Sequence, residues 1–574
     1  MQKGVPQIMD ITSIRSVLHN LSEEILPSRF ETAQQPEPNI IQFCLRGISN
    51  QTWIEVSWNS DSARILKIKK PQKIGAESTL SKQLRYGLKY KALVNIEQDK
   101  FERVIKFGFA KKPGEEIDKY LIFELMGKHS NIFYLDNNQK IIAVGKQINS
   151  SQSSFRIVST GSIYSEPPKN MKKEPRLNES YESWKESIST VPESLRYCLV
   201  NTYQGVSPIL TKQIEAFSDL SGSEIMNKNI DYISETNLKR IFESWKIWID
   251  RFNNNNFNFS IFDNNFYSVW FLKNELNHKN NIDQIKGLEN YYGFHLKKRK
   301  IETLIKKIDG IIFKQTNIEK KNFNSQSNLL INSENYQEYK DKADKIFMTH
   351  DIKKQDIIKG QKLYKKAKKL KRAQNLIKER IDIYKNRLDR LEEFTTLLNN
   401  SNSLKNENLT VRINLLEEIK DEICREFNVK IKKIREQKRN SPPIESSPIE
   451  IHTPKGLIVQ IGRNMRQNEL ISFKFSKKGD LWFHAQESPG SHVVLKSSSQ
   501  DPSDEDIQIS ADLAALFSKA KMNIKVPISL VKIKDLQKIT KGGTGCVSFN
   551  NVEILWGNPT RGEDYIKKNL KRVI

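Results

Sequence analysis

The sequence predicts a multidomain α+β protein in which a long antiparallel coiled-coil arm separates two regions of mixed helix and strand. Three observations lead to this prediction. Short strand-like runs dominate the first 170 residues, apolar residues recur at heptad spacing between Leu363 and Leu398, and strand-like runs return after residue 448. The length favours roughly three to four domains. The predicted domains are 1–172, 173–270, 271–440 and 441–574.

The charge of the chain indicates a polyanionic partner. Its 574 residues include 94 Lys and Arg against 68 Asp and Glu, a net charge of +26 at pH 7. Nucleic acid is the commonest partner of so basic a chain. The four cysteines lie too far apart for a CxxC pair or a disulfide framework. Because the sequence has neither a signal-peptide pattern nor an apolar run of about 18 to 20 residues, we expect a cytoplasmic protein without a membrane segment.

The first region combines two helices with a series of strands. Apolar residues recur at helical spacing over Asp10–Leu26, and a polar helix is predicted over Ser78–Leu88. The predicted strands are Ile40–Leu45, Trp53–Trp58, Arg64–Ile68, Ala92–Glu97, Glu102–Phe109, Tyr120–Leu125, Asn131–Asp136 and Lys140–Val144. Between two of them lies the polar loop Gly127–Asn131. Such a loop can offer N–H groups, a Lys and hydroxyls to a phosphate, although an ordinary turn is the commoner case.

The second region, from 175 to about 265, is predicted to be helical. Helix-like runs at 195–200 and 209–214 flank a turn that contains Gly205 and Pro208. A helix-hairpin-helix would direct the backbone amides of this turn at nucleic-acid phosphates. A plain corner between two helices fits the same residues equally well.

The arm is predicted from the clearest pattern in the chain. Its seam alternates steps of four and three residues and comprises Leu363, Ala367, Leu370, Gln374, Ile377, Ile381, Tyr384, Leu388, Leu391, Thr395 and Leu398. A helix stripe over Ile301–Ile312 precedes it, followed by an Asn/Ser-rich break near 317–335. A polar tip at Asn399–Asn408 and a second stripe over Ile413–Phe427 complete the predicted antiparallel pair.

Basic residues crowd the beginning of this seam. They are Lys362, Lys365, Lys366, Lys368, Lys369, Lys371 and Arg372. Such runs on coiled coils are usually solvated flanks. Their density here favours a phosphate-contacting patch as well, whereas a membrane or calmodulin-type helix is disfavoured because the partner helix occupies the apolar seam.

The last region is predicted as a second α+β unit after a Ser/Pro linker at 441–448. Its strands are Leu457–Ile461, Leu470–Phe475, Leu481–His484, Val493–Leu495, Val526–Val531, Val547–Phe549 and Val552–Leu555, with a helix over Asp504–Lys521. The turn Ser488–Ser491 joins two of these strands. This hairpin brings together two His, a Trp, an Asp and a Ser near one bend. Trp482 fits the core as well as a binding surface, because strand aromatics usually pack.

No sequence pattern indicates catalysis. The chain lacks GxxxxGK[ST], GxGxxG, HExxH and GxSxG motifs. His484 and His492 have no Cys close in sequence to complete a zinc site. Asp480, His484 and Ser491 could be imagined as a hydrolytic triad, but nothing in the sequence shows that they converge. We therefore expect no enzyme activity, no metal and no cofactor.

Several blocks together resemble the NFACT family. They are GLIVQIGRNMRQNELISFKFS and DLWFHAQESPGSHVVLK near the C-terminus, and ELMGKHSNIFYLD, SFRIVSTGSIYSEPP, YQGVSPILTKQI and KLYKKAKKLKRA earlier in the chain. They cover nearly the whole chain in the family's order. The resemblance implies a glycosylase-like N-terminal domain without the glycosylase's N-terminal Pro and Glu, a helix-hairpin-helix, a coiled-coil arm and an RNA-binding domain. It also implies a small strand-bearing insert on the arm, which this chain has in shortened form between Ala343 and Lys362.

The resemblance implies a ribosome-associated quality-control factor. It implies binding, as a monomer, to the large ribosomal subunit with its peptidyl-tRNA, and recruitment of alanine tRNA for untemplated alanine tails. The family's Asp-Arg pair for tRNA falls on Glu102 and Arg103, with Glu in place of Asp. The residues implied for tRNA binding are Glu102, Arg103, Lys128, His129, Ser130 and Asn131. Those implied for RNA or ribosome binding are Arg463, Asn464, Asp480, Trp482, His484, Pro489, Gly490, Ser491 and His492.

Three other functions stay open at this point. An RNA-binding scaffold without tailing activity fits the Glu102 substitution. A nucleic-acid enzyme is opposed by the absent motifs. A surface adhesin, which an older family label suggests, is opposed by the absence of a signal peptide and anchor.

Overall fold

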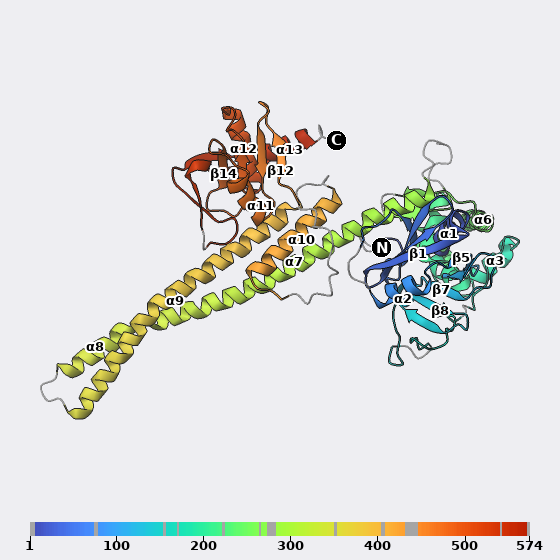
Figure 1. Ribbon diagram of the computed structural model, residues 1–574, viewed down its shortest axis with the longest axis horizontal. Coiled ribbons are helices and arrows are strands. Elements are labelled where there is room, and N and C mark those ends of the chain that lie inside the picture. The colour runs from blue at the N-terminus through green and yellow to red at the C-terminus, as the bar shows by residue number, and fades with distance from the viewer. Residues whose placement is uncertain are drawn as a thin grey trace. The chain divides into compact units, whose positions relative to one another are not determined.

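The structure, a computed structural model, describes residues 6–73, 78–152, 156–168, 171–220, 224–262, 266–271, 283–333, 335–348, 353–402, 408–430, 446–539 and 542–570 (Figure 1). Described residues up to Arg299 form one compact unit, and those from Lys300 onward form a second. The division into four domains stays a prediction. Residue 440, one of its boundaries, and 441–445 of the predicted linker lie outside the described residues.

The first unit is built on a nine-stranded antiparallel sheet of order β4-β3-β2-β1-β5-β6-β7-β8-β9. The strands are β1 Ser28–Glu37, β2 Ile40–Arg46, β3 Gln51–Ser57, β4 Arg64–Ile68, β5 Ala92–Gln98, β6 Val104–Ala110, β7 Lys119–Glu124, β8 Asn131–Asp136 and β9 Ile141–Val144. The sequence prediction missed β1, whose polar run SRFETAQQPE lacks a strong apolar alternation. This strand joins the two halves of the sheet, because it pairs with both β2 and β5.

Helices α1 (Ile11–Ile25) and α2 (Thr79–Gly87) bury their apolar sides in the core of this sheet. Asp10 begins α1 as its N-cap, since its Oδ1 accepts the N–H of Ser13 at 2.8 Å. Ser78 begins α2 in a capping box with Ser81. Both helices were predicted within one residue at each end.

A cluster of helices follows the sheet in the first unit. It comprises α3 Tyr181–Ile188, α4 Leu195–Thr202, α5 Pro208–Phe217, α6 Glu235–Asn253, the 3-10 turns Ile225–Asn227 and Ile230–Tyr232, and the strand pair β10 Ser260–Phe262 with β11 Phe266–Ser268. Trp184, Trp245, Trp248 and Trp270 are fully buried in its core. Gly205, at φ +70°, turns the chain between α4 and α5 where a side chain would press on Phe101.

The long helical region consists of α7 Gln284–Ser333, α8 Tyr336–Phe347, α9 Lys354–Asn400 and α10 Leu409–Glu426. The predicted break at 317–335 is wrong, because α7 continues to Ser333. Within the second unit, the nearly buried Glu319 pairs with Arg387 of α9 at 2.8 Å. This tertiary contact outweighs the weak helix propensity of the Asn/Ser run.

The packing partners along the predicted seam also differ from the prediction. The beginning of α9 packs on α8, where Gly360 lies against the ring of Phe347 and that ring stacks on Tyr364. The end of α9 packs on both α7 and α10 in one apolar cluster. The helix after the polar tip therefore covers only the end of the seam, and residues 403–407 of that tip lie outside the described residues.

The C-terminal part of the second unit contains a six-stranded antiparallel sheet of order β12-β13-β15-β14-β16-β19. Its elements are β12 Ile449–His452, β13 Ile458–Ile461, α11 Met465–Glu469, β14 Leu481–Ala485, β15 Val493–Leu495, α12 Asp504–Leu516, β16 Val526–Lys532, β17 Leu536–Lys538, β18 Val547–Phe549, β19 Glu553–Gly557 and α13 Pro559–Leu570, with a 3-10 turn at Ile533–Asp535. One face packs on α12 and α13, and the other carries a smaller core around Trp482.

The predicted strand over Leu470–Phe475 is wrong. These residues form a π-helical turn, Leu470–Lys474, that continues α11. The N-terminus of α11 is fixed by Asn464, which caps Gln467, and by Glu422 of α10, which accepts the N–H groups of Met465 and Arg466 at 3.1 Å each. The predicted helix at 504–521 is shorter and ends at Leu516.

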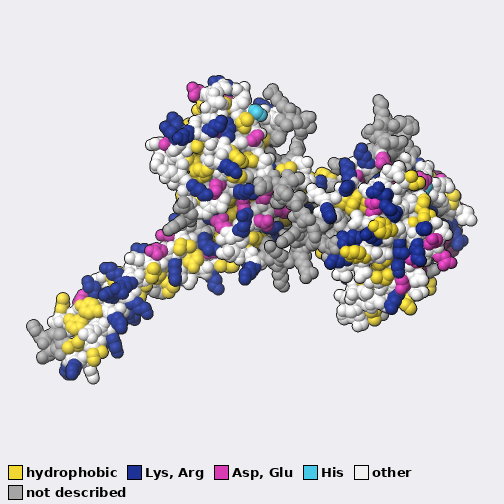
Figure 2. Space-filling model, in the orientation of Figure 1, with side chains coloured by type: hydrophobic (Ala, Val, Ile, Leu, Met, Phe, Trp, Pro, Cys, Tyr) yellow, Lys and Arg dark blue, Asp and Glu magenta, His cyan; other side chains and the backbone are white. Residues whose placement is uncertain are grey.

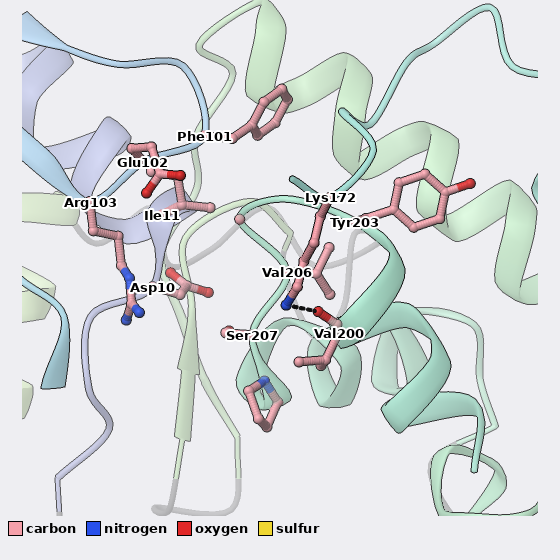
Figure 3. A pocket seen from close by; sticks show the side chains of 12 residues that line it. Asp10, Ile11, Phe101, Glu102, Arg103, Lys172, Val200, Tyr203, Val206 and Ser207 are labelled. Carbon is pink, nitrogen blue, oxygen red and sulfur yellow. Dashed lines mark hydrogen bonds between the residues drawn. The ribbon is translucent and has the colours of Figure 1, made fainter. Parts of the chain in front are cut away.

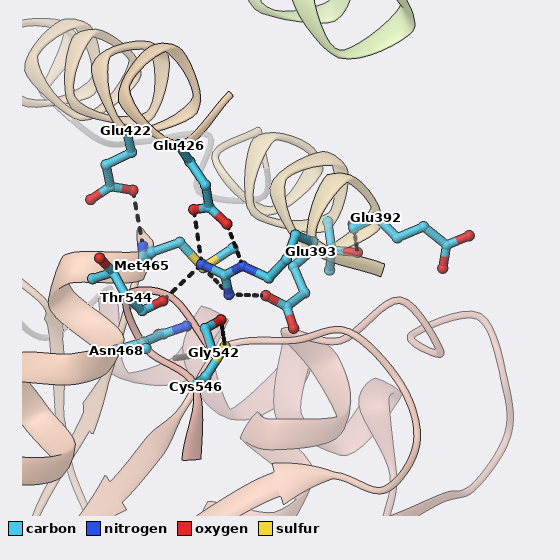
Figure 4. Close-up of polar contacts among 12 residues, drawn as sticks. Glu392, Glu393, Glu422, Glu426, Met465, Asn468, Gly542, Thr544 and Cys546 are labelled. Atoms are coloured by element: carbon cyan, nitrogen blue, oxygen red, sulfur yellow. Dashed lines mark hydrogen bonds and ion pairs between the residues drawn. The ribbon is translucent and has the colours of Figure 1, made fainter. Parts of the chain in front are cut away.

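Within the second unit, a buried polar network attaches this sheet domain to α9 and α10 (Figure 4). Arg390 donates to Glu426 at 2.8 and 3.1 Å and to the carbonyl of Thr544 at 2.8 Å. Burial raises the pKa of Glu422 to about 7 despite its two backbone donors. Because Arg390 and Glu422 lie on packed helices and contact the Thr544 loop and the start of α11, the network fixes the orientation of the sheet domain on α9 and α10.

Candidate functional site

A cavity of about 290 Å³ opens in the first unit where the start of α1, the segment before β6 and the turn between α4 and α5 meet. It is lined by Asp10, Ile11, Phe101, Glu102, Arg103, Lys172, Val200, Tyr203, Gly205, Val206, Ser207 and Pro208 (Figure 3). The lining mixes two carboxylates with two cations. It also includes the N-terminus of α5, where Ser207 caps the N–H of Leu210.

Arg103 is the residue that distinguishes this cavity. Its backbone carbonyl accepts the N–H of Leu125 at 2.9 Å, which holds the main chain on the sheet. Its guanidinium makes no hydrogen bond or ion pair within the described part of the chain. Burial lowers the pKa of Arg103, while the charges of Asp10 and Glu102 oppose the shift. A mostly desolvated guanidinium without such a partner is poised to bind an anion.

Lys172 and Asp10 add opposite charges to the same cavity. The ammonium of Lys172 donates to the carbonyl of Val200 at 2.7 Å (Figure 3), and burial lowers its pKa. Burial raises the pKa of Asp10, although Ser13 and Arg103 favour its charged form. Neither residue was predicted as part of a site. The only sequence signals were a helix cap at Asp10 and a Met-Lys-Lys run at 171–173.

A second cavity, of about 570 Å³, shares Glu102 and Arg103 with the first. His129, Met126, Pro167, Pro168 and Met171 complete its lining. Lys128 and His129 are exposed on the 3-10 turn Gly127–His129. The structure therefore brings four of the six residues predicted for tRNA, namely Glu102, Arg103, Lys128 and His129, to open positions in one unit.

The other two, Ser130 and Asn131, are buried and cannot face a partner. Asn131 ties the start of β8 to the segment after β9, because its side chain donates to the carbonyl of Lys146 and accepts the Lys146 N–H, both at 2.8 Å. These two residues hold the loop that presents Lys128 and His129.

Glu124 connects two of the sequence blocks that resemble the family, ELMGKHSNIFYLD and SFRIVSTGSIYSEPP. It is buried at the end of β7 and accepts a two-point contact from Arg156 at 2.9 and 2.8 Å, as well as the hydroxyl of Tyr164 at 2.9 Å. The Arg156 guanidinium also lies over the rings of Phe133 and Tyr164. The contacts fix the segment that leads to Pro167 and Pro168 at the second cavity.

The C-terminal hairpin, predicted as a second binding surface, consists mainly of buried structural residues. Asp480, Trp482, Ser491 and His492 are buried, and so is Asn464. Asp480 accepts the N–H groups of Lys477 and Ser498 at 2.9 and 3.0 Å. Gly490 is packed against Ser518. The prediction that these side chains form a surface is wrong, because β14 and β15 pair in the interior of the sheet and leave both faces covered at this point.

The remaining residues of that prediction are less enclosed. Arg463, His484 and Pro489 are half-buried. His484 stacks on Trp482 with centroids 5.5 Å apart and meets His492 edge-on at 5.4 Å. Burial lowers the pKa of His484 to about 4 and that of His492 well below its usual range, so both rings are neutral at pH 7.

All seven residues of the basic patch on α9 are exposed. Lys366 lies over the ring of Tyr339 at 4.0 Å, and Lys371 over that of Tyr336 at 5.8 Å, both on α8. Figure 2 shows Lys and Arg side chains gathered along this part of the helices. The patch can contact phosphates, as its composition suggested.

Among the described residues, no three His, Cys, Asp or Glu side chains lie close enough to hold a metal ion. In the same residues, no helix has the length and apolar character needed to cross a membrane.

Family models match most of the chain. The model of the NFACT N-terminal and middle domains matches residues 10–357, and that of the NFACT protein RNA binding domain matches residues 449–551. Curated relatives named Rqc2 homolog RqcH are similar over nearly the full length. The one from Streptococcus pneumoniae serotype 2 is 24% identical over 587 residues, with 95% of this chain and 97% of the relative covered. That from Bacillus subtilis is 23% identical over 577 residues, covering 94% and 96%.

Solved structures are similar over about half of the chain. The C-terminal part of a fibronectin/fibrinogen-binding protein from Streptococcus suis is 28% identical, covers 48% of this chain and 98% of its own, and has a TM-score of 0.39. A fibrinogen binding protein from Staphylococcus aureus is 18% identical, covers 49% and 98%, and has a TM-score of 0.38. The family model over residues 10–357 spans more than half of the chain, and the chain therefore belongs to the NFACT family.

Proposed function

We propose that this protein is a cytoplasmic ribosome quality-control factor. It binds the large ribosomal subunit that carries peptidyl-tRNA and recruits alanine tRNA, so that alanine tails mark the stalled chain for degradation. Membership of the NFACT family and the full-length relatives named Rqc2 homolog RqcH support this role.

The observation that carries the tRNA part of the proposal is the guanidinium of Arg103. It lies between two cavities, desolvated and without an ion pair to any described residue, beside Glu102. An RNA phosphate or an unpaired base edge satisfies such a group. His129 lines the second cavity, and Lys128, exposed on the same 3-10 turn, adds a further phosphate contact.

The protein acts in this proposal as a positioning factor and not as an enzyme. The ribosome carries out peptidyl transfer, so no catalytic residue, metal or cofactor is needed. The helix-turn-helix of α4 and α5 serves as the helix-hairpin-helix of the family, next to the first cavity. The helical region serves as a coiled-coil arm whose basic patch on α9 contacts rRNA, since clustered lysines supply salt-sensitive phosphate binding. One copy of the chain acts on one subunit.

A scaffold without tailing activity is the second candidate, and Glu102 favours it. The family's Asp is replaced by Glu at the position next to Arg103, which moves the carboxylate by one methylene. Because Glu102 lines both cavities, this change alters the space in which tRNA is positioned.

The test is to purify the tagged protein from its own cells on a gradient and to sequence the bound RNA. Co-migration with free large subunits and enrichment of alanine tRNA is the expected result. Subunits without tRNA would identify the scaffold, and the absence of ribosomal RNA would contradict the ribosomal role. Arg103→Ala serves as the matched variant, because it should weaken tRNA recovery and leave subunit recovery intact. Equal loss of both would contradict the separate tRNA role of Arg103.

A further inference from the structure

A second surface of the first unit combines cations with exposed aromatic rings. It is formed by Arg29 of β1 and by Lys82, Arg85, Tyr86, Lys89 and Tyr90 of α2 and the turn after it; we refer to these six residues as the α2 surface. Leu80, Leu84 and Leu88 are buried on the opposite side of the same segment. The segment thus uses its apolar side for the core, and its outer side carries basic and aromatic side chains together with the exposed polar residues Thr79 and Gln83.

The two tyrosines are unusually open for aromatic side chains. Tyr86 is 67% exposed and Tyr90 is 65% exposed. The Arg85 guanidinium lies 5.0 Å from the ring centre of Tyr86, and its Nη2 donates to the Tyr86 hydroxyl at 3.0 Å. The ammonium of Lys89 lies 4.9 Å from the ring centre of Tyr90. Each ring is therefore oriented by a cation and still accessible to solvent.

The backbone holds this surface in a fixed shape. Tyr90 has φ +66°, a left-handed conformation that a large side chain rarely adopts. Two hydrogen bonds with Phe30 maintain it, from the Phe30 N–H to the carbonyl of Lys91 at 2.9 Å and from the Tyr90 N–H to the carbonyl of Phe30 at 3.3 Å. Gly87 lets α2 approach the sheet, since a Cβ there would lie 2.2 Å from the hydroxyl of Tyr134.

The charge of the surface is positive even after its acidic neighbours are counted. Asp118 pairs with Lys91 at 2.5 Å, and Glu31 pairs with Arg46 and, at 3.6 Å, with Arg29. Lys82 and Lys89 form no ion pair with any described residue. On the face shown in Figure 2, Lys and Arg side chains lie beside hydrophobic ones over the region of α2.

We propose that the α2 surface binds unpaired RNA. Bases stack on the rings of Tyr86 and Tyr90. The flexible side chain of Lys89, which lies over the Tyr90 ring, moves aside when a base stacks there. Phosphates contact Lys82 and Lys89. Exposed aromatics that alternate with cations are the arrangement by which proteins bind single strands without reading their sequence. The α2 surface shares no residue with the cavities of Arg103, so it is a separate RNA contact that does not depend on the tRNA role proposed above.

Photocrosslinking tests this surface directly. The full-length protein is irradiated with a 4-thiouridine-containing RNA of about 12 nucleotides, within the usual length of a single-strand site. We expect a crosslink in the peptide that carries Tyr86 and Tyr90, both in the wild type and in Arg103→Ala. Crosslinks confined to other peptides would overturn the proposal, whereas the tRNA role of Arg103 would be unaffected.

Binding affinity provides the second readout. Tyr86→Ala/Tyr90→Ala should weaken binding of the same oligomer at least about thirtyfold, because two base-stacking contacts are lost. Tyr86→Phe/Tyr90→Phe keeps the rings and should bind as the wild type does. Tyr232→Ala is the matched control, since Tyr232 is 85% exposed in the same unit but has no cation partner among the described ring contacts. Equal loss in the Phe variant, or capture of anionic vesicles without this crosslink, would overturn the proposal.

Discussion

Two regions that were both predicted to bind RNA differ in what the fold does with their polar side chains. Around Arg103, charged groups line cavities of about 290 and 570 Å³, and the guanidinium has no hydrogen-bond partner among the described residues. In the hairpin of β14 and β15, Asp480 is fully buried and accepts two backbone N–H groups, and Trp482 is packed against His484, His492 and Phe549.

The difference shows that a motif rich in polar residues can either bind a ligand or stabilise the fold. A polar group that is buried with its partners stabilises the fold and is unavailable to a ligand. A charged group that is desolvated without a partner lowers the free energy of unfolding. A ligand that pairs with the group stabilises the folded protein. Substitutions in the hairpin should therefore change stability first, and substitutions at the cavities should change RNA affinity first.

The largest expected effect is that of Asp480→Ala. The substitution leaves the N–H groups of Lys477 and Ser498 without their acceptor inside the sheet domain. We expect a loss of about 3 kcal/mol in the free energy of unfolding, at the upper end for hydrogen bonds to a buried charge. Denaturant unfolding of the full chain, with hydrogen exchange of residues 449–557 to locate the change, measures it. If Asp480→Ala kept the wild-type hydrogen-exchange protection of residues 449–557 but lost RNA binding, Asp480 would contact the ligand itself.

The opposite result is expected for Arg103→Ala. Its free energy of unfolding should change by less than about 1 kcal/mol, since no described partner is lost, and tRNA affinity should fall about tenfold, the value of one charge-assisted contact. Arg103→Lys should recover only part of this affinity, because an ammonium lacks the planar fork of the guanidinium. Affinity is measured by filter binding. A variant that unfolds without weaker binding when folded would place Arg103 with the structural residues.

Acid should destabilise the hairpin region before the rest. The folded-state pKa of His484, about 4, lies below its ordinary value of 6.5, so unfolding takes up a proton. The stability that depends on the neutral His484 ring is fully present above pH 6.5 and is lost as the pH falls towards 4. Between pH 7 and 4.5, His484→Gln should reduce the decline in the free energy of unfolding by about 1–3 kcal/mol. Identical pH profiles for the two proteins would contradict burial as the cause.

The smallest effect is expected for Lys128→Ala on the exposed 3-10 turn. Stability should change by less than about 0.5 kcal/mol, as for most surface substitutions. The slope of log affinity for tRNA against log salt should fall by about 0.7 to 0.9, the value for one phosphate contact. Asn131→Ala is the matched comparison in the same loop: it should destabilise the protein and leave this slope unchanged once folded. An unchanged slope in Lys128→Ala would exclude a phosphate contact.

The sequence by itself determined much of the local structure. Period-two and helical spacing, together with short apolar runs, predicted α1, α2 and most strands of both sheets close to their observed bounds, because the buried sides of these elements repeat at the period of the local structure. Composition indicated an anionic partner, and the motif blocks indicated the family that the family models then showed. Four of the six residues predicted for tRNA proved to be open.

Only the tertiary structure decided which side chains are enclosed and which remain open. The polar strand β1 is held by its neighbours on both sides, and α7 continues through an Asn/Ser run beside Arg387. Glu422 of α10 fixes the N-terminus of α11, which continues into a π-helical turn where a strand was predicted. The same holds for the site, where Asp10 and Lys172 join Arg103 from positions 93 and 69 residues away in sequence. Burial and partner choice depend on such distant contacts, which are set by packing and not by local sequence.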